Sequence, residues 1–573
     1  MEGNFKTSRN IFSDANYYHY IVQYQGNINE EVSKYPGYYV TIINNKYAII
    51  SADRELELNL EKPIFSSIVY VATPDIFTLE EISPIEASKA NFLQLDLPLK
   101  LTGNGVDVAI IDTGIDYLNA EFMKENGETR IEYIWDQTIN STEKDIKSTV
   151  VPFGTVYAKN NIQEAIDAFK TGKSPYEIVQ TKDEIGHGTN MAGIIGASGK
   201  NPDLKGVVPE CDFVVVKLIE SLTYKKQYNI QIPIFDIVSI FAALEFLYRY
   251  SLRNNKPMVI YFPLGSNFGS HKGNGILELY MESLSRNSGM AIVTGAGNQG
   301  TSGTHTSGII SKVGESRSIQ LYVSPEQKFT VAYIWIDSPN IMSLNIVSPS
   351  GESTGIINAE INTLETYSFL FENTNIRIND YLPEANTGDQ LIRIRFSNIK
   401  EGIWNLILKG ESILDGKFNA WIPQEGVSVG GTRFISSDPY GTIMNPATSE
   451  YVMTAAGYNQ NNNSILSYSG MAFLDDYINR IDVAAGSVNA LTVAPNNTTA
   501  IVNGTSVSAA ILAGACAMLF EWGIIDGNDP NMYSQTIKAY IAKGAVQRSG
   551  DVYPNPQWGY GILNIFKMFQ HMT

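Results

Sequence analysis

Cysteine is scarce in this sequence, which contains only Cys211 and Cys516 among its 573 residues. Two such positions cannot build a disulfide framework or a cysteine-based metal site. Neither lies in a recognisable catalytic setting, and apolar residues stand beside both. Each cysteine is therefore predicted to be a small buried hydrophobic residue.

Basic residues are a minority, with 41 Lys and Arg against 59 Asp and Glu and a formal net charge of −18. Because phosphate binding needs a basic face, nucleic acid is not an expected partner. No run of about 18 apolar residues is present, so no membrane span is predicted. The residues from Met1 to Lys6 contain no apolar segment of a signal peptide, which predicts cytoplasmic synthesis.

The length predicts two or three domains, because one hydrophobic core rarely organises so long a chain. In residues 1–80, short segments of alternating apolar and polar residues predict the strands of a small α+β domain. Residues 81–308 alternate buried strands with helices, which predicts a parallel sheet covered on both faces. Residues 309–436 alternate at period two and predict an inserted antiparallel sandwich, after which the α/β pattern resumes over 437–573.

Within the α/β part, short apolar runs predict buried strands and longer or small-residue runs predict helices. The strands are expected at 106–111, 213–218, 258–262, 290–293 and 451–456, and the helices at 191–197, 236–250 and 506–520.

The first candidate catalytic residue is Asp112, in the string Ile111-Asp112-Thr113-Gly114. A carboxylate at the carboxyl end of a buried parallel strand lies where crevices form in α/β sheets. A turn-capping role would explain most isolated Asp-Thr-Gly triplets. An aspartic protease also uses this triplet but needs a second copy, and none occurs. Taken alone, the motif is weak.

The second candidate is His187, in Gly186-His187-Gly188-Thr189 before a helix of small residues. The flanking glycines allow a close backbone approach and place the imidazole at the helix N-terminus. A lone histidine is more often structural, but this setting favours catalysis.

The third candidate, Ser506, follows Gly504-Thr505 at the start of another small-residue helix. Its own N–H and the positive end of the helix dipole would face a developing oxyanion. A simple helix cap is the alternative, but it does not explain Gly504. Asn298, which follows Gly297 after a buried strand, is predicted to donate the second oxyanion hydrogen bond from its side-chain amide.

These motifs resemble those of the subtilisin family of serine proteases, whose triad runs Asp, His, Ser along the chain. The resemblance extends to Gly206-Val207-Val208-Pro209 and Gly559-Tyr560-Gly561. It implies a subtilisin-like fold and a serine endopeptidase with Asp112, His187 and Ser506 as its triad. It also implies that two short segments bind the substrate. Leu264 and Gly265 lie in the first, and Gly295 and Gly297 lie in the second.

The specificity region departs from the family pattern, which usually has Asn where Tyr261 stands and Ser where Pro263 stands. The preference of the specificity pocket is therefore left open. A second substrate-binding edge is expected after Val216-Lys217-Leu218-Ile219. Its continuation, Tyr224-Lys225-Lys226-Gln227, either favours acidic side chains or is a solvated loop.

Within the family, the chain resembles the Csp germination proteases of clostridial spores, including in Ser83-Pro84-Ile85-Glu86 and in the string 554–561. That resemblance implies a prodomain that assists folding and is cut between Glu80 and Glu81. It implies that the inserted sandwich is a jelly roll. The implied substrate is the zymogen of a spore cortex-lytic enzyme, and the implied location is the spore.

Two other functions remain open: a catalytically silent, germinant-sensing pseudoprotease, and a general digestive protease. The intact triad favours an active enzyme, and the lack of a visible signal peptide counts against digestion. No cofactor is expected. His271 and His305 have no partner at metal-ligand spacing, so no zinc is assigned. Calcium is left open because no clear loop of oxygen ligands is visible.

Overall fold

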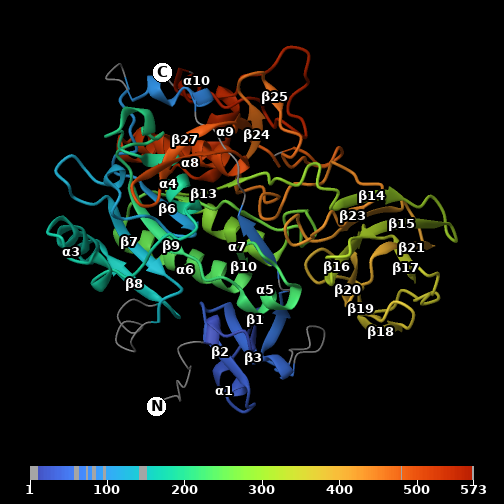
Figure 1. Ribbon diagram of the computed structural model, residues 1–573. Coiled ribbons are helices and arrows are strands. Elements are labelled where there is room, and N and C mark those ends of the chain that lie inside the picture. The colour runs from blue at the N-terminus through green and yellow to red at the C-terminus, as the bar shows by residue number, and fades with distance from the viewer. Residues whose placement is uncertain are drawn as a thin grey trace.

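The computed structural model describes residues 11–56, 64–72, 75–79, 86–94, 99–140, 151–478 and 480–570. Figure 1 shows three parts: a small N-terminal domain (blue), a large α/β unit and, to one side of it, a sandwich of strands (yellow). The predicted fold class, a subtilisin-like parallel sheet with a small α+β domain and an inserted antiparallel sandwich, is confirmed. The predicted domain boundaries stay predictions.

The N-terminal domain is a four-stranded antiparallel sheet in the order β2-β3-β1-β4. Its elements are β1 (Tyr17–Tyr24), α1 (Ile28–Val32), β2 (Tyr38–Ile42), β3 (Tyr47–Asp53) and β4 (Ile68–Val71). Alternate residues serve two cores: Val22 and Ile50 pack within the domain, while Ile21 and Ile49 pack against the α/β unit. Because one face of this thin sheet is buried only against the α/β unit, the two parts depend on each other.

The α/β unit is built on a nine-stranded sheet, in the order β25-β24-β13-β11-β6-β9-β7-β8 with β26 beside β24. All pairs are parallel except β7–β8 and β24–β25. The strands are β6 (Asp107–Asp112), β7 (Ile131–Asp136), β8 (Thr155–Ala158), β9 (Asp212–Lys217), β11 (Met258–Tyr261), β13 (Met290–Gly295), β24 (Met453–Asn459), β25 (Ser464–Ile465) and β26 (Val483–Gly486).

Each face of this sheet is covered by its own helices. On one face lie α4 (His187–Gly196) and α8 (Thr505–Phe520); on the other lie α6 (Ile237–Asn254) and α7 (Ile276–Ser285). Side chains alternate along β6, so Val108 and Ile110 face α4 and α8 whereas Ala109 and Ile111 face α6. About half of the side chains of each central strand therefore pack into the core on one face of the sheet, and the other half pack into the core on the other face.

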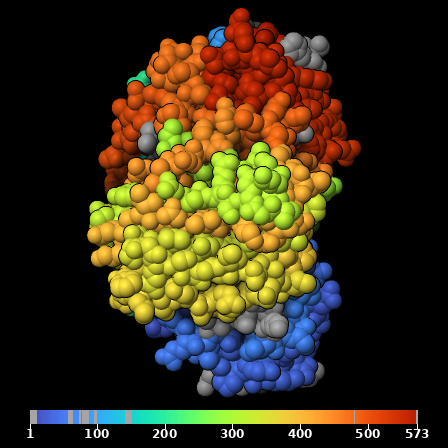
Figure 2. Space-filling view, turned by 90° about the vertical axis from the view of Figure 1, so that its right-hand side faces the viewer, coloured from blue at the N-terminus to red at the C-terminus, as the bar shows by residue number. Residues whose placement is uncertain are grey.

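The inserted sandwich packs two antiparallel sheets, β14-β22-β16-β20-β19-β18 and β17-β21-β15-β23, around a core that contains Trp404. Its strands are β14 (His305–Ile309), β15 (Ser316–Val323), β16 (Phe329–Ile336), β17 (Ile341–Val347), β18 (Thr363–Phe369), β19 (Thr374–Tyr381), β20 (Gln390–Ser397), β21 (Gly402–Ser412), β22 (Lys417–Trp421) and β23 (Arg433–Phe434). In Figure 2 the yellow sandwich lies between the orange and red end of the chain and the blue N-terminal domain.

Shorter elements complete the described chain. The further strands are β5 (Ile76–Leu79), β10 (Ile234–Asp236), β12 (Leu264–Gly265), β27 (Ala490–Ala494) and β28 (Thr498–Val502), and the further helices are α3 (Lys159–Lys170), α5 (Leu222–Tyr228), α9 (Ser534–Gly544) and α10 (Ile565–Gln570). Single turns of 3₁₀-helix occur at 11–13, 54–56, 86–88, 90–92, 120–122, 175–177 and 202–204.

Helix α8 continues through a π-helical turn, so that Thr505–Ile525 is long and apolar enough to cross a membrane by length and composition alone. However, 83% of its most apolar window is buried inside the fold. This is the pattern of a core helix in a folded protein.

Candidate active site

Asp112 ends strand β6 at the carboxyl edge of the central sheet. The alternation that turns Val108 and Ile110 toward α4 and α8 places the Asp112 side chain on the same face. Asp112 is fully buried, and its Oδ1 accepts a hydrogen bond from the N–H of Thr113 at 2.6 Å. The end of β6 thus places a carboxylate near the N-termini of α4 and α8.

His187 is the first residue of α4, four residues earlier than the predicted start of that helix. Its Nδ1 lies 2.8 Å from Oδ2 and 3.0 Å from Oδ1 of Asp112. Gly186 precedes it with φ of +90°, a conformation that suits glycine. A Cβ on Gly188 would lie 2.1 Å from the carbonyl oxygen of Gly114, so only glycine lets the two loops approach this closely.

Asp183 holds the turn that presents His187, and the sequence reasoning missed it. Its Oδ1 accepts from the N–H of Gly186 at 2.8 Å, and its Oδ2 accepts from the N–H and hydroxyl of Thr189 at 2.8 and 2.6 Å. These bonds satisfy N–H groups at the start of α4. The sequence signal was an acidic residue just before a predicted helix, where a carboxylate is favoured.

Ser506 is the second residue of α8, so its N–H lies at the helix N-terminus, the positive end of the helix dipole. Gly504 caps the helix with φ of +139°. Asn298 lies beside it after β13, and its Oδ1 accepts from the N–H and hydroxyl of Thr505 at 3.3 and 3.2 Å. This contact orients the amide so that Nδ2 faces away from Thr505, as an oxyanion donor requires.

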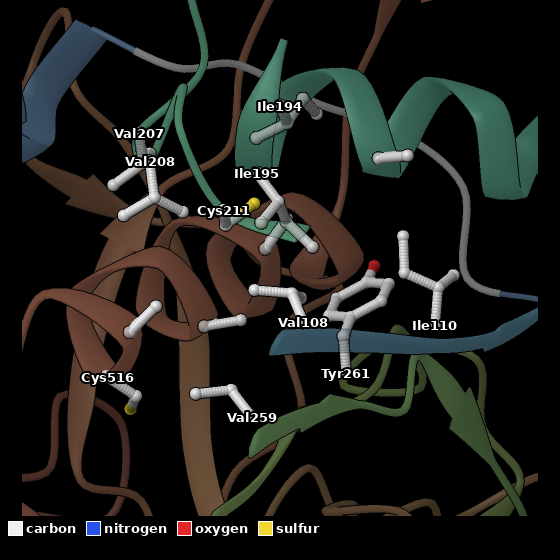
Figure 3. Close-up of a cluster of buried hydrophobic side chains, with 14 of the residues drawn as sticks. Val108, Ile110, Ile194, Ile195, Val207, Val208, Cys211, Val259, Tyr261 and Cys516 are labelled. Carbon is white, nitrogen blue, oxygen red and sulfur yellow. The ribbon is translucent and has the colours of Figure 1, made fainter. Parts of the chain in front are cut away.

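Tyr261, the residue that departs from the family pattern, lies beneath the candidate nucleophile. Its ring extends from β11 into the cluster of apolar side chains between the sheet and the helices (Figure 3). Its hydroxyl donates to the backbone carbonyl of Ser506 at 2.8 Å. The side chain therefore ties the first turn of α8 to the sheet.

The predicted substrate-binding edge is occupied by the chain's own strand β5. Its residues 76–79 form the middle strand of a three-stranded antiparallel sheet in the order β10-β5-β12. Leu264 pairs with Leu79 and Gly265 with Thr78. On the other side Ile234 pairs with Thr78. A segment of the chain thus lies in an extended conformation between two edges, as a bound peptide would.

The second edge is β10, which follows residues 216–219 along the chain after helix α5. Residues 224–227 belong to that helix, so they are neither part of an extended edge nor a loop. The chain turns through this helix before it returns to the groove, a path that the local sequence pattern did not reveal. Gly295 ends β13, and Gly297 leads to Asn298 with φ of +95°. Glu80 and Glu81 lie outside the described residues.

The cysteines and the two loop histidines lie in packed surroundings. Cys211 and Cys516 are both free and buried (Figure 3), and burial raises the pKa of the Cys211 thiol to about 12. His271 and His305 both stack on Trp421, with ring centroids 4.1 and 4.6 Å from that of the indole. Within the described ranges, no group of three or more His, Cys, Asp or Glu side chains could hold a metal ion.

Comparison with known proteins gives a consistent family. The model of the subtilase family matches residues 103–336 and 427–561. The structure of the Clostridium perfringens CspB protease superposes with a TM-score of 0.74 and 30% identity, covering 84% of this chain and 97% of that one.

Two curated relatives of lower identity are proteinases. The PII-type proteinase of Lacticaseibacillus paracasei and the PIII-type proteinase of Lactococcus lactis subsp. cremoris are each 25% identical over 283 residues, which is 48% of this chain. The match spans only 13% and 12% of their respective lengths.

Proposed function

Because the chain belongs to the subtilase family of serine proteases, we propose that it hydrolyses peptide bonds with Asp112, His187 and Ser506 as its catalytic triad. The observation that carries this assignment is the hydrogen bond between His187 Nδ1 and Asp112 Oδ2, 2.8 Å long and buried at the start of α4.

In this mechanism, Ser506 Oγ attacks the substrate carbonyl while His187 Nε2 takes its proton. Asp112 accepts from Nδ1–H, so that Nε2 carries the lone pair, and it stabilises the imidazolium that forms. The N–H of Ser506 and Nδ2 of Asn298 donate to the oxyanion. His187 then returns the proton to the leaving amine, and water releases the acyl group by the same route.

A fluorophosphonate probe tests the assignment directly. An activated serine reacts with it, so the wild-type protein is expected to carry one label, on Ser506, as located by peptide mass spectrometry. Prior incubation with the small covalent serine inhibitor phenylmethylsulfonyl fluoride should prevent that labelling. Absence of any label on Ser506 in folded protein would favour a silent sensor over an enzyme.

We further propose that the enzyme cuts its own N-terminal domain between Glu80 and Glu81. The support is strand β5, which ends at Leu79 and already lies against the edge Leu264–Gly265. The domain that precedes it is expected to act as a folding-assisting prodomain, because it buries one face of its sheet on α6 and α7.

Sequencing of the N-terminus of the self-processed protein is expected to begin at Glu81. The expectation follows from the pairing of Leu79 with Leu264, which places the end of β5 just before Glu80 at this edge. A shift of one residue would turn every side chain of β5 to the opposite face of the strand. A mature chain that begins outside residues 78–84 would contradict the assignment.

The physiological reaction that we propose is activation of a protein zymogen by limited proteolysis during spore germination, with the zymogen of a cortex-lytic enzyme as substrate. The support is the 30% identity to the CspB protease over almost all of that chain.

A further inference from the structure

One of the two edges that pair with β5 is very short. β12 has only two residues and ends at Gly265, which pairs with Thr78. The next residue, Ser266, pairs with Asn445 instead: each donates its N–H to the carbonyl of the other at 2.9 Å. Main-chain pairing by β12 therefore does not extend to Ile76, the first residue of β5.

Gln424, which follows β22 of the inserted sandwich, contacts β5 where β12 has ended. Its Nε2 donates to the carbonyl of Ile76 at 2.9 Å and to the carbonyl of Gly265 at 3.3 Å. The nitrogen of a side-chain amide carries two hydrogens, so it can make both bonds, whereas the amide oxygen has none to donate. One side chain thus bridges the end of β12 and the start of β5.

Contacts that do not involve β5 hold Gln424 in this position. The N–H of the next residue, Glu425, donates at 2.9 Å to Oε1 of Gln299, which directly follows the candidate oxyanion donor Asn298. The carbonyl of Gln424 accepts from the N–H of Ser428 at 2.9 Å, and the whole side chain is buried. Because the amide is anchored from outside the groove, it is expected to keep its place when another peptide replaces β5.

This contact is an addition to the subtilase pattern. The family model matches residues 103–336 and 427–561, so the segment that carries Gln424 lies outside the match. β10 and β12, the two edges of the groove, lie inside it. The inserted segment therefore supplies a third contact with the strand in the groove, which the family edges do not provide.

The side chain of Ile76 is held less closely than its main chain. It lines a cavity of about 240 Å³ together with Pro423 and Val427, which flank Gln424 in the sequence. A cavity of this volume leaves room for a larger side chain. Since Gln424 binds the main-chain carbonyl, its bond does not depend on which side chain the peptide carries at this position.

We propose that Gln424 is a substrate-binding residue that holds the main chain of the fifth residue upstream of the scissile bond. With cleavage after Glu80, Ile76 is that fifth residue. The inference rests on the proposed protease function and deepens it. The substrates it implies are polypeptide segments that are extended over at least five residues upstream of the cut, with little selection of the fifth side chain.

The test removes the carbonyl that Gln424 binds. The self-processed enzyme is given an equimolar mixture of two peptides: residues 77–86 with an N-terminal acetyl group, and the same peptide with a 3-phenylpropanoyl group in place of acetyl-Phe77. In the first, the acetyl carbonyl takes the position of the Ile76 carbonyl, and the second lacks it. The ratio of their rates of loss, followed by mass spectrometry, is the ratio of kcat/KM. Any N-terminal domain retained in the groove lowers both rates equally.

Gln424→Met keeps the length of the side chain and removes its donor. The wild-type enzyme is expected to consume the acetylated peptide faster, and Gln424→Met should lower that ratio roughly fivefold, the effect of one neutral hydrogen bond. The N–H of Phe77, which the second peptide also lacks, contributes equally in both enzymes and cancels. Gln424→Asn keeps a buried amide but draws it back by one methylene, so it should lower the ratio too and replaces the first variant if that one does not fold.

Gln390→Met is the matched control. Gln390 is similarly buried, on β20 of the same sandwich, and its amide bonds to the main chain of Met342 and to the carboxylate of Asp380. The substitution removes the same buried group from the sandwich at a site remote from β5 in the sheet order. It should keep the wild-type ratio.

The two levels of the hypothesis fail in different ways. An unchanged ratio in the folded Gln424 variants, or an equal fall in Gln390→Met, would overturn the role of Gln424 and leave the protease function standing. So would a wild-type enzyme that cuts itself but cleaves neither peptide. A Gln424 variant that takes the fluorophosphonate label yet no longer cuts itself would support the inference. If the wild-type protein neither cuts itself nor takes the label, both proposals are overturned.

Discussion

Replacing Ser506 by alanine is expected to lower kcat for peptide hydrolysis by about 10⁶-fold, the size of the effect when a subtilisin loses its nucleophile. The variant should also remain uncut between its N-terminal domain and the rest of the chain. Without Oγ no acyl-enzyme can form, and only oxyanion stabilisation by Asn298 and the backbone remains. The measurements are single-turnover peptide hydrolysis and the mass of the purified chain.

The fold should survive this change, because alanine is a better helix former than serine and loses only one oxygen. Ser508→Ala is the matched control: Ser508 lies in the same helix turn and is equally buried. Its hydroxyl pairs with that of Ser487 and donates to Ala485, away from His187. The control should retain self-cleavage. Hydrolysis by purified Ser506→Ala protein at more than about one thousandth of the wild-type rate would contradict the assignment.

Replacing Asp112 by asparagine is expected to lower kcat by about 10⁴-fold, as the same change does in another serine protease with this triad. Oδ1 of Asp112 accepts from the N–H of Thr113, so the amide oxygen of asparagine would take that position. The amide Nδ2 would then face Nδ1 of His187 and donate to it. The imidazole would be held with its proton on Nε2, where it cannot accept the proton of Ser506.

The control for this variant is Asp116→Asn, four residues along the same loop. The Asp116 carboxylate accepts from the N–H groups of Leu118 and Asn496, and no contact with His187 is involved. Its kcat should stay within a few-fold of the wild-type value. Comparable losses in the two variants would show that the effect comes from disturbance of the loop rather than from the tautomer of His187. Circular dichroism of both variants would check the fold.

The candidate catalytic residues could be recognised from local sequence. His187 and Ser506 could be named because each stands at the start of a helix rich in small residues. Asp112 could be named because it ends a buried apolar strand, and Asn298 because it follows Gly297 just after another. The central strands could be placed from their short apolar runs and the helices from their longer or small-residue runs.

Other contributors could not be found in this way, because their partners are remote along the chain. Tyr261 bonds to Ser506 across 245 positions, and Gln424 bonds to Ile76 across 348. The second edge of the groove, β10, is three residues long and lies next to β5 only after α5 turns the chain. No local pattern encodes such pairings, since they depend on the packing of separate parts.

By itself, the sequence determined the fold class, the family and the candidate triad of this protein, because periodicity and glycine-rich motifs are local properties. Only the tertiary structure decided which two edges flank the segment in the groove and what surrounds it. Arg377 stands on β19, and Arg393 and Arg395 stand on β20, among ordinary period-two residues. Nothing in their spacing along the sequence indicates that they line one cavity. They come together because strand pairing aligns them and because the sandwich packs against both the groove and the N-terminal domain.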